Sequence, residues 1–184
     1  MKYVIEHLEP KLYKWCFLEY RHISKLIGKE NLIFTNLNSN QAEKLKKYGK
    51  CYTESVAELK FVKICVLDPE AETTLTPKEC RQFKYMIFGG ILGDYPPRKR
   101  TKGELKLKGE RRNLGKEQFP TDNAVMVTKL ISEGLSLEKM KFSDELEIKI
   151  KEGESVELPF RYLLVNGKPL ISEELVEYVK KHQF

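Results

Sequence analysis

The sequence predicts an α/β protein with a largely parallel sheet flanked by helices. Apolar runs typical of buried strands alternate with helical patterns through residue 133, and strands that are joined through helices usually pair in parallel. Beyond residue 135 the pattern changes to the alternation of polar and apolar residues that antiparallel strands show. We therefore expect an α/β core at residues 1–135 and a small β-rich extension at 136–184 packed on it.

The composition fits one globular domain. The 184 residues are 41% apolar and 33% charged, which allows a real core and is unlike a disordered chain. No apolar run approaches the roughly 20 residues of a membrane span, and the N-terminus begins like a strand rather than a signal peptide. We expect a cytoplasmic protein with no membrane partner.

The expected elements follow from local patterns. Short apolar runs predict strands at 2–7, 31–35, 61–67 and 84–92, with a further short strand inside 48–60. Helical spacing predicts helices from Glu9-Pro10 to Ile27, at 38–47 and at 121–134, where Thr121 to Asn123 form the cap. Thr76-Pro77 with Glu79 predicts another helix start. In the extension, turns at 152–153 and 166–167 indicate hairpins, and Ser172 caps a last helix.

Two kinds of polar residue have structural interpretations. The four cysteines contain no CxxC pair, and their flanks favour buried apolar positions over metal or disulfide use. Glu19 falls on the apolar stripe of the first long helix, so its carboxylate should be paired, with Arg21 or His22 as the expected partner.

Ligands of parallel α/β sheets bind beyond the carboxyl ends of the strands. Three segments follow strand ends here: 7–9, 68–72 and 89–97. They bring together the carboxylates of Glu6, Glu9, Asp68, Glu70 and Asp94. Clustered acids can bind a cationic substrate, bind a metal or act as a base, although each acid alone is more commonly a cap, turn or ion-pair residue.

The run Gly89-Gly90-Ile91-Leu92-Gly93 is unusual at the end of a buried strand. We expect these glycines to bring backbone close to a ligand rather than to serve packing. The spacing is neither GxGxxG nor a P-loop, which argues against nucleotide phosphates and favours a flat heterocycle such as adenine. A bulge or a close helix crossing at Gly89 and Gly90 is the structural alternative.

A basic cluster follows. Between Arg98 and Arg112 there are eight Lys or Arg residues and two Glu residues, within a chain of formal net charge +6. Such a cluster favours an anionic partner, RNA or a ribonucleoprotein surface. A solvated loop that keeps the protein soluble explains the composition equally well.

The same stretch carries a resemblance to a known family. The motifs are Phe88 to Asp94, Pro96-Pro97-Arg98 with Arg100-Thr101, Arg112 to Gly115, Glu117-Gln118 and Thr121 to Val125, together with matches at 5–9, 67–71 and 158–162. With these motifs the chain resembles the SPOUT-class methyltransferases, in the branch that contains the eukaryotic enzyme methylating an arginine of a small-subunit ribosomal protein.

The resemblance implies a trefoil knot at about 84–133 and S-adenosylmethionine (SAM) as the cofactor, with no metal. Its implied cofactor contacts are Gly89, Gly90, Leu92, Gly93, Leu114, Gly115, Gln118, Thr121, Asn123 and Ala124. One departure from the family pattern is visible at Phe119-Pro120, because Pro120 has no N–H to donate.

The implied activity is arginine methylation of a ribosomal protein. Among the acids we expect Glu6, Asp68 and Asp94 to be catalytic, and we expect Glu9, Glu70, Arg98 and Arg100 to bind the substrate. An rRNA or tRNA methyltransferase, with RNA held by the 98–112 cluster, is one alternative, and a non-catalytic ribosome-binding module is another. The extension favours a monomer, although many knotted methyltransferases are homodimers.

Overall fold

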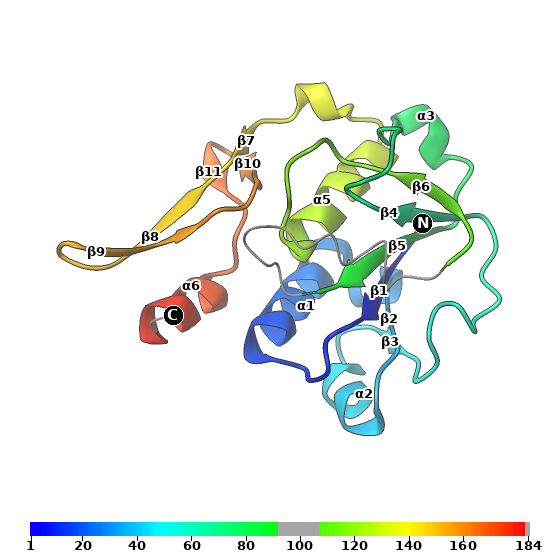
Figure 1. Ribbon diagram of the computed structural model, residues 1–184, viewed down its shortest axis with the longest axis horizontal. Helices are drawn as coiled ribbons and strands as arrows, with labels where there is room; N and C mark the ends of the chain where they lie inside the picture. Colours follow the sequence, from blue (N-terminus) through cyan, green and yellow to red (C-terminus); the bar gives the residue numbers. More distant parts are fainter. Residues whose placement is uncertain (92–106, 183–184) are drawn as a thin grey trace.

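The structure is a computed structural model that describes residues 1–91 and 107–182. Its centre is a six-stranded sheet in the order β3-β2-β1-β5-β4-β6, with every pair parallel (Figure 1). The strands are β1 (Lys2–His7), β2 (Leu32–Thr35), β3 (Lys50–Cys51), β4 (Ile64–Leu67), β5 (Tyr85–Gly90) and β6 (Glu110–Arg112). The predicted α/β class with a largely parallel sheet is confirmed.

One face of the sheet is covered by helices. The long helices α1 (Lys14–Ile27) and α5 (Thr121–Ser132) pack there, and the short helices α2 (Ser39–Leu45) and α3 (Pro77–Cys80) contribute Leu45 and Cys80 to the same core. The first helix was predicted to begin at Glu9-Pro10, which is wrong. Residues 9–13 are extended or bent because the chain must travel from the sheet edge to the helical face before α1 begins after Tyr13.

The opposite face is covered by irregular chain. Its core contains Val56, packed against Val4, Val66 and their neighbours on the central strands. The Phe61 ring stacks on Tyr85 with centroids 4.3 Å apart. In the described part of the chain this face carries no helix, so the expected alternation of helices over two faces holds on one face only. A face without a helix leaves the carboxyl ends of the strands accessible to the turns of residues 53–58.

The capping signal predicted at Thr76 is confirmed. Thr76 and Glu79 form the expected capping box at α3, and Asn38 with Gln41 forms a second box at α2. The cap of α5 differs from the prediction. Pro120 occupies the N-cap, and Thr121 to Asn123 form the first helical turn.

The C-terminal extension consists of small antiparallel units. Strands β7 (Phe142–Ser143), β10 (Tyr162–Val165) and β11 (Lys168–Pro169) form one sheet, and β8 (Leu146–Lys151) with β9 (Glu154–Leu158) forms a hairpin that projects from the molecule (Figure 1). Helix α6 (Glu173–Lys181) begins after Ser172, whose Oγ accepts from Leu175 N as predicted. Among the described residues no helix is long and apolar enough to cross a membrane.

Part of the segment expected to form the knot, residues 92–106, lies outside the described residues. The trefoil knot and the division at residue 135 therefore stay predictions.

Candidate functional site

Neighbouring strands bring polar residues into one row at the carboxyl edge of the sheet. Glu6 of β1 pairs in register with Thr35 of β2 on one side and with Gly89 of β5 on the other. Asp68 directly follows β4, and the alternation of strand residues places it on the same face as Val66. Two of the predicted catalytic carboxylates thus flank the backbone of Gly89 on the face without helices.

The Glu6 carboxylate is buried and held by three donors. Thr35 Oγ1 donates to Oε2 at 2.5 Å and Val56 N donates to the same oxygen at 2.9 Å, while Ser55 Oγ donates to Oε1 at 2.5 Å. Only 3% of Glu6 is exposed. None of these three donors was predicted as a partner of Glu6. Ser55 and Val56 come from a segment that shows no periodic pattern.

Asp68 is also buried and paired. Its Oδ2 accepts from Arg111 Nη1 at 2.8 Å, and its Oδ1 accepts from the backbone N of Glu70 at 3.0 Å. Glu70 itself is exposed at the rim. Arg111 belongs to the basic cluster between Arg98 and Arg112. This member of the cluster therefore forms an ion pair with an acid of the row, and its side chain is partly exposed.

The two described glycines of the run have different roles. A Cβ on Gly90 would lie 2.2 Å from the Tyr20 hydroxyl and 2.9 Å from Ile5 Cγ2, so Gly90 is needed for packing against α1. The expectation that packing does not require it is wrong, and the alternative of a close helix crossing is confirmed there. A Cβ on Gly89 would make a tight contact of 3.3 Å with Ile91 Cδ1, the end of a flexible side chain, so packing excludes a side chain at Gly89 less strictly than at Gly90.

Tyr20 also contacts His7, the last residue of β1. Its hydroxyl lies 2.9 Å from Nδ1 of His7, which is the register partner of Gly90. Burial lowers the pKa of His7, and the charge of Glu9 opposes that shift. The neutral imidazole is thus the form that this buried position favours.

A pocket of about 500 Å³ opens beside the ends of β1 and β2. Its lining combines the Glu9 carboxylate with polar side chains and backbone from both strand ends: His7, Leu8, Glu9, Pro10, Asn36, Leu37, Asn38, Gln41 and Thr53. An acid among amides and a hydroxyl suits a cationic or strongly hydrogen-bonding group. Glu9 therefore lies where a predicted substrate-binding acid can act.

On the helical side, the segment before α5 forms a second candidate surface. Leu114 is buried, and Gly115 has a φ of +99°, a conformation that favours glycine. The side-chain Oε1 of Gln118 is buried and has no hydrogen-bond partner among the described residues. A buried amide oxygen without a donor fits a ligand that brings an N–H or ammonium group, and SAM carries both. These residues therefore fit the expected cofactor.

Arg161 of the C-terminal extension contacts the segment that precedes α5. Its backbone N donates to Gln118 O at 2.8 Å, its Nε donates to Asp144 Oδ1 at 2.5 Å, and its guanidinium lies over the Phe142 ring. The extension thus braces the segment that we expect to hold the cofactor.

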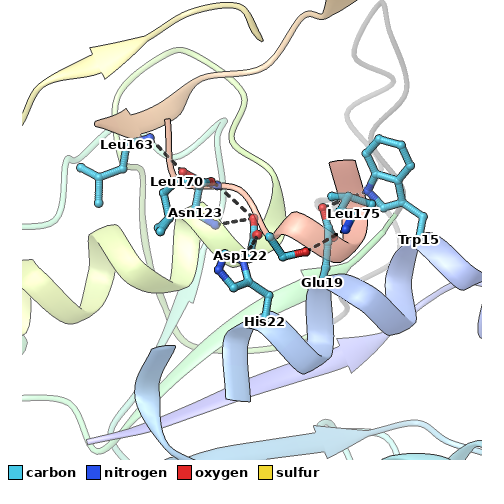
Figure 2. A network of polar contacts seen from close by, with 9 residues as sticks. Trp15, Glu19, His22, Asp122, Asn123, Leu163, Leu170 and Leu175 are labelled. Atoms are coloured by element: carbon cyan, nitrogen blue, oxygen red, sulfur yellow. Dashed lines mark hydrogen bonds and ion pairs between the residues drawn. The ribbon is translucent and has the colours of Figure 1, made fainter. Parts of the chain in front are cut away.

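Other predicted cofactor residues take part in an internal network (Figure 2). Asn123 Oδ1 accepts from Leu163 N at 2.8 Å, and Asn123 Nδ2 donates to Leu170 O at 2.9 Å and to Asp122 Oδ1 at 3.0 Å. The neighbouring Thr121 is buried and Ala124 is half-buried. The side chain of Asn123 fastens the extension to α5, so any cofactor contact from this residue would come from its backbone.

Replacing Asn123 by Ala should loosen the extension. The substitution leaves Leu163 N and Leu170 O without their partner, and we expect it to lower the free energy of unfolding by about 2–4 kcal/mol. Hydrogen exchange should accelerate in β10 before it does in β1. Asn31→Ala, which removes only local bonds to Ile27 O and Glu30 Oε1, is the matched control. Equal stability of the two variants would contradict this role.

The partners predicted for Glu19 are wrong. Glu19 Oε1 accepts from Trp15 Nε1 at 3.1 Å, whereas His22 Nδ1 lies 2.7 Å from Asp122 Oδ2 (Figure 2). Arg21 pairs with Glu174 instead. Residues four apart share a helix face, which is why Trp15 reaches Glu19 and Arg21 does not.

Glu19 should make stability fall as the pH rises. Burial and the nearby Asp122 charge raise the pKa of the Glu19 carboxyl from 4.5 to about 8, against hydrogen bonds from Trp15 and Thr121. Between pH 4.5 and about pH 8 the Glu19 carboxyl loses its proton in the unfolded chain but keeps it in the folded protein. The contribution of Glu19 to the free energy of unfolding is therefore fully present below pH 4.5 and falls as the pH rises to about 8. Urea unfolding at several pH values should show this fall, and Glu19→Gln should flatten it. An unchanged slope in the variant would refute the assignment.

Several predicted site residues lie outside the described residues: Leu92, Gly93, Asp94, Arg98 and Arg100. Within the described parts of the chain no group of three or more His, Cys, Asp or Glu could hold a metal ion. Cys16, Cys65 and Cys80 are buried, as predicted, and Cys51 is half-buried; all four are free thiols.

Comparison with known proteins identifies the class to which this fold and edge belong. The family described as "Protein arginine N-methyltransferase SFM1-like" matches residues 2–183. The protein arginine N-methyltransferase SFM1 of Saccharomyces cerevisiae is 39% identical over 203 aligned positions, which span 98% of this chain and 95% of the yeast protein. The chain therefore belongs to the SFM1-like family of protein arginine N-methyltransferases.

Solved structures agree. The yeast SFM1 structure complexed with SAM superposes with a TM-score of 0.88 at 37% identity, covering 98% of this chain and 90% of that one. A Trm10 structure from Thermococcus kodakaraensis has a TM-score of 0.62 at 20% identity over 75% of this chain and 95% of its own, a likeness of fold alone. The resemblance inferred from the motifs, to a branch that contains an arginine methyltransferase, is confirmed by the family match and by the yeast relative.

Proposed function

We propose that the protein transfers a methyl group from SAM to an arginine of a ribosomal protein. Family membership supports arginine as the acceptor, and the yeast relatives solved with SAM and with S-adenosylhomocysteine support the cofactor. The observation that carries the proposal is the row in which Glu6 and Asp68 flank Gly89. A guanidinium is planar and cationic, and carboxylates on two sides can orient it.

The cofactor would lie against Leu114, Gly115 and Gln118, with further contacts from the first turn of α5. Gln118 Oε1 would accept from a ligand N–H, and Gly115 would let the ligand approach the backbone. When bound, SAM supplies an electrophilic methyl group on a sulfonium. The acceptor nitrogen forms the new N–CH₃ bond while the sulfur keeps the electron pair of the broken bond.

The acids have the remaining task. The guanidinium nitrogen that receives the methyl group must lose one proton. We assign a carboxylate of the row as the base that takes this proton. Glu6 is the stronger candidate because its three hydrogen-bond donors are uncharged, whereas Asp68 pairs with the Arg111 cation. Glu9, in the pocket beside β1 and β2, would hold the substrate chain on the same edge. Most of the rate enhancement would come from positioning.

Labelled SAM and ribosomal subunits test the proposal. Incubation with the purified protein should put label into a protein band that resists nuclease, and peptide mass spectrometry should place the methyl group on arginine. Label that resists protease and is lost to nuclease would instead indicate an RNA methyltransferase. If the protein transfers no methyl group and calorimetry detects no binding of SAM, the results would favour a non-catalytic ribosome-binding module.

The oligomeric state belongs to the same proposal. Helix α6 and strand β10 of the extension contact α1 and α5, and this covered surface supports a monomer. A sedimentation experiment should give the mass of one chain, 21.5 kDa, and a dimer mass would contradict it.

A further inference from the structure

The pocket beside the ends of β1 and β2, which we call the β1–β2 pocket, adjoins the acidic row. Three of its lining residues stand within two chain positions of Glu6 or of a residue that donates to Glu6. The pairs are His7 with Glu6, Asn36 with Thr35, and Thr53 with Ser55. An extended peptide advances about 3.3 Å per residue. A substrate whose arginine lies at Glu6 can therefore place a nearby residue in this space of about 500 Å³.

Hydrogen bonds fix the walls of the β1–β2 pocket. Asn36 Nδ2 donates to His7 O at 2.7 Å, and Asn36 N donates to Glu54 O at 2.8 Å. The backbone of Asn36 has a φ of +60°, a conformation that is uncommon for residues other than glycine. Asn38 and Gln41 are held in the capping box of α2. A pocket with walls that are ordered before binding loses little conformational entropy when a ligand enters.

The lining of the pocket suits a cation. Glu9 is half-buried, and no lysine or arginine is present among the described residues that line the pocket. The amide and hydroxyl side chains of the lining offer further oxygen acceptors. A carboxylate has about four acceptor sites, so Glu9 can hold a ligand cation together with a neighbour of its own. An ammonium or guanidinium group therefore fits this lining better than an anion does.

His7 adds an unsatisfied nitrogen to the same pocket. Only 1% of His7 is exposed, and its Nε2 has no hydrogen-bond partner among the described residues. Burial lowers the pKa of His7, while the Glu9 charge and the Lys11 backbone oppose that shift. A neutral ring that donates Nδ1–H to the Tyr20 hydroxyl, 2.9 Å away, keeps a lone pair on Nε2. A cationic ligand can supply the donor that this nitrogen lacks.

We infer that the β1–β2 pocket is a second substrate subsite, which selects a lysine or arginine within about three positions of the target arginine. Glu9 pairs with the flanking cation, and His7 is a specificity-determining residue that offers Nε2 to it. The acidic row meanwhile holds the target arginine itself. The inference rests on the proposed function, because it extends the same edge of the sheet to a longer stretch of the substrate chain. The protein would thus prefer basic sequences over isolated arginines.

The test uses the full chain, SAM and peptides with one central arginine. Each flanking position in turn carries lysine or acetyl-lysine, which keeps the stem and removes the charge. At one flanking position kcat/KM should be at least about tenfold higher for lysine, chiefly through a lower KM. Glu9→Gln should reduce this ratio to about one. Glu43→Gln, which removes an exposed acid of α2 outside the pocket lining, should keep it. Because each ratio compares two peptides on one sample, partial unfolding does not change it.

Anisotropy of the same peptides, labelled and titrated in the presence of S-adenosylhomocysteine, measures the preference without methyl transfer. Methylation or binding with no preference for lysine at any position overturns the inference and leaves the proposed function intact. A preference that persists in Glu9→Gln also overturns it, because the flanking cation then binds elsewhere on the edge. A binding preference that Glu9→Gln abolishes, with no methylation by any sample, supports the subsite and contradicts the proposed function. Failure of every peptide to bind contradicts both.

Discussion

Glu6→Gln should lower kcat for arginine methylation by about 10²–10⁴-fold, the usual contribution of a positioned general base. The variant separates charge from shape. The amide oxygen can still accept from Thr35 Oγ1 and Val56 N, and the new NH₂ can donate to Ser55 Oγ, so each hydrogen-bonding group retains a partner. Folding and SAM affinity should therefore be preserved, because Glu6 is not among the predicted cofactor contacts.

The measurement is steady-state transfer to the substrate protein, with SAM affinity from calorimetry. Glu54→Gln is the matched control, since Glu54 is an exposed acid on the segment that also carries Ser55. Full activity in Glu6→Gln would remove Glu6 from the catalytic role and leave the row as a structural feature. Equal losses in both variants would indicate a general effect of negative charge at this edge.

Gly90→Ala should destabilise the fold itself. The added Cβ would lie 2.2 Å from the Tyr20 hydroxyl and 3.1 Å from Glu6 O, so α1 must move away from the sheet. Overpacking of this kind costs about 1–3 kcal/mol or more. The neighbouring Gly89→Ala is the matched control, because its Cβ meets only flexible side-chain atoms at 3.3 Å and beyond. We expect Gly89→Ala to fold normally and to slow methyl transfer, because it narrows the space beside Glu6.

A double-mutant cycle assigns the Gly90 effect to Tyr20. Tyr20→Phe removes the hydroxyl that the new Cβ would meet, at the cost of its bond to His7. The double variant should then be more stable than the sum of the single losses predicts, by about 1–2 kcal/mol. Strict additivity would place the clash elsewhere and contradict the packing role of Gly90.

The sequence predictions were correct for interactions between residues that are close in the sequence and wrong where distant residues decide the contact. Caps at Thr76 and Ser172 depend on neighbours three residues away, and they were predicted correctly. The partners predicted for Glu19 were wrong because acids that are distant in the sequence take both cations: Asp122 of α5 pairs with His22, and Glu174 of α6 pairs with Arg21. The glycine run was interpreted as one ligand feature, yet it is Tyr20 that requires glycine at position 90. Tyr20 comes close to Gly90 only after α1 packs on β5.

The amino-acid sequence by itself determined the class of the fold, the strand ends at which polar residues gather and, through its motifs, the methyltransferase family. These are properties of local periodicity and of short residue patterns. Only the tertiary structure decided which carboxylates meet. Glu6 and Ser55 are separated by 49 positions, and Asp68 and Arg111 by 43. Parallel strands pair in a register set by burial of both faces, and that register aligned Glu6 with Gly89 and placed Asp68 on the far side.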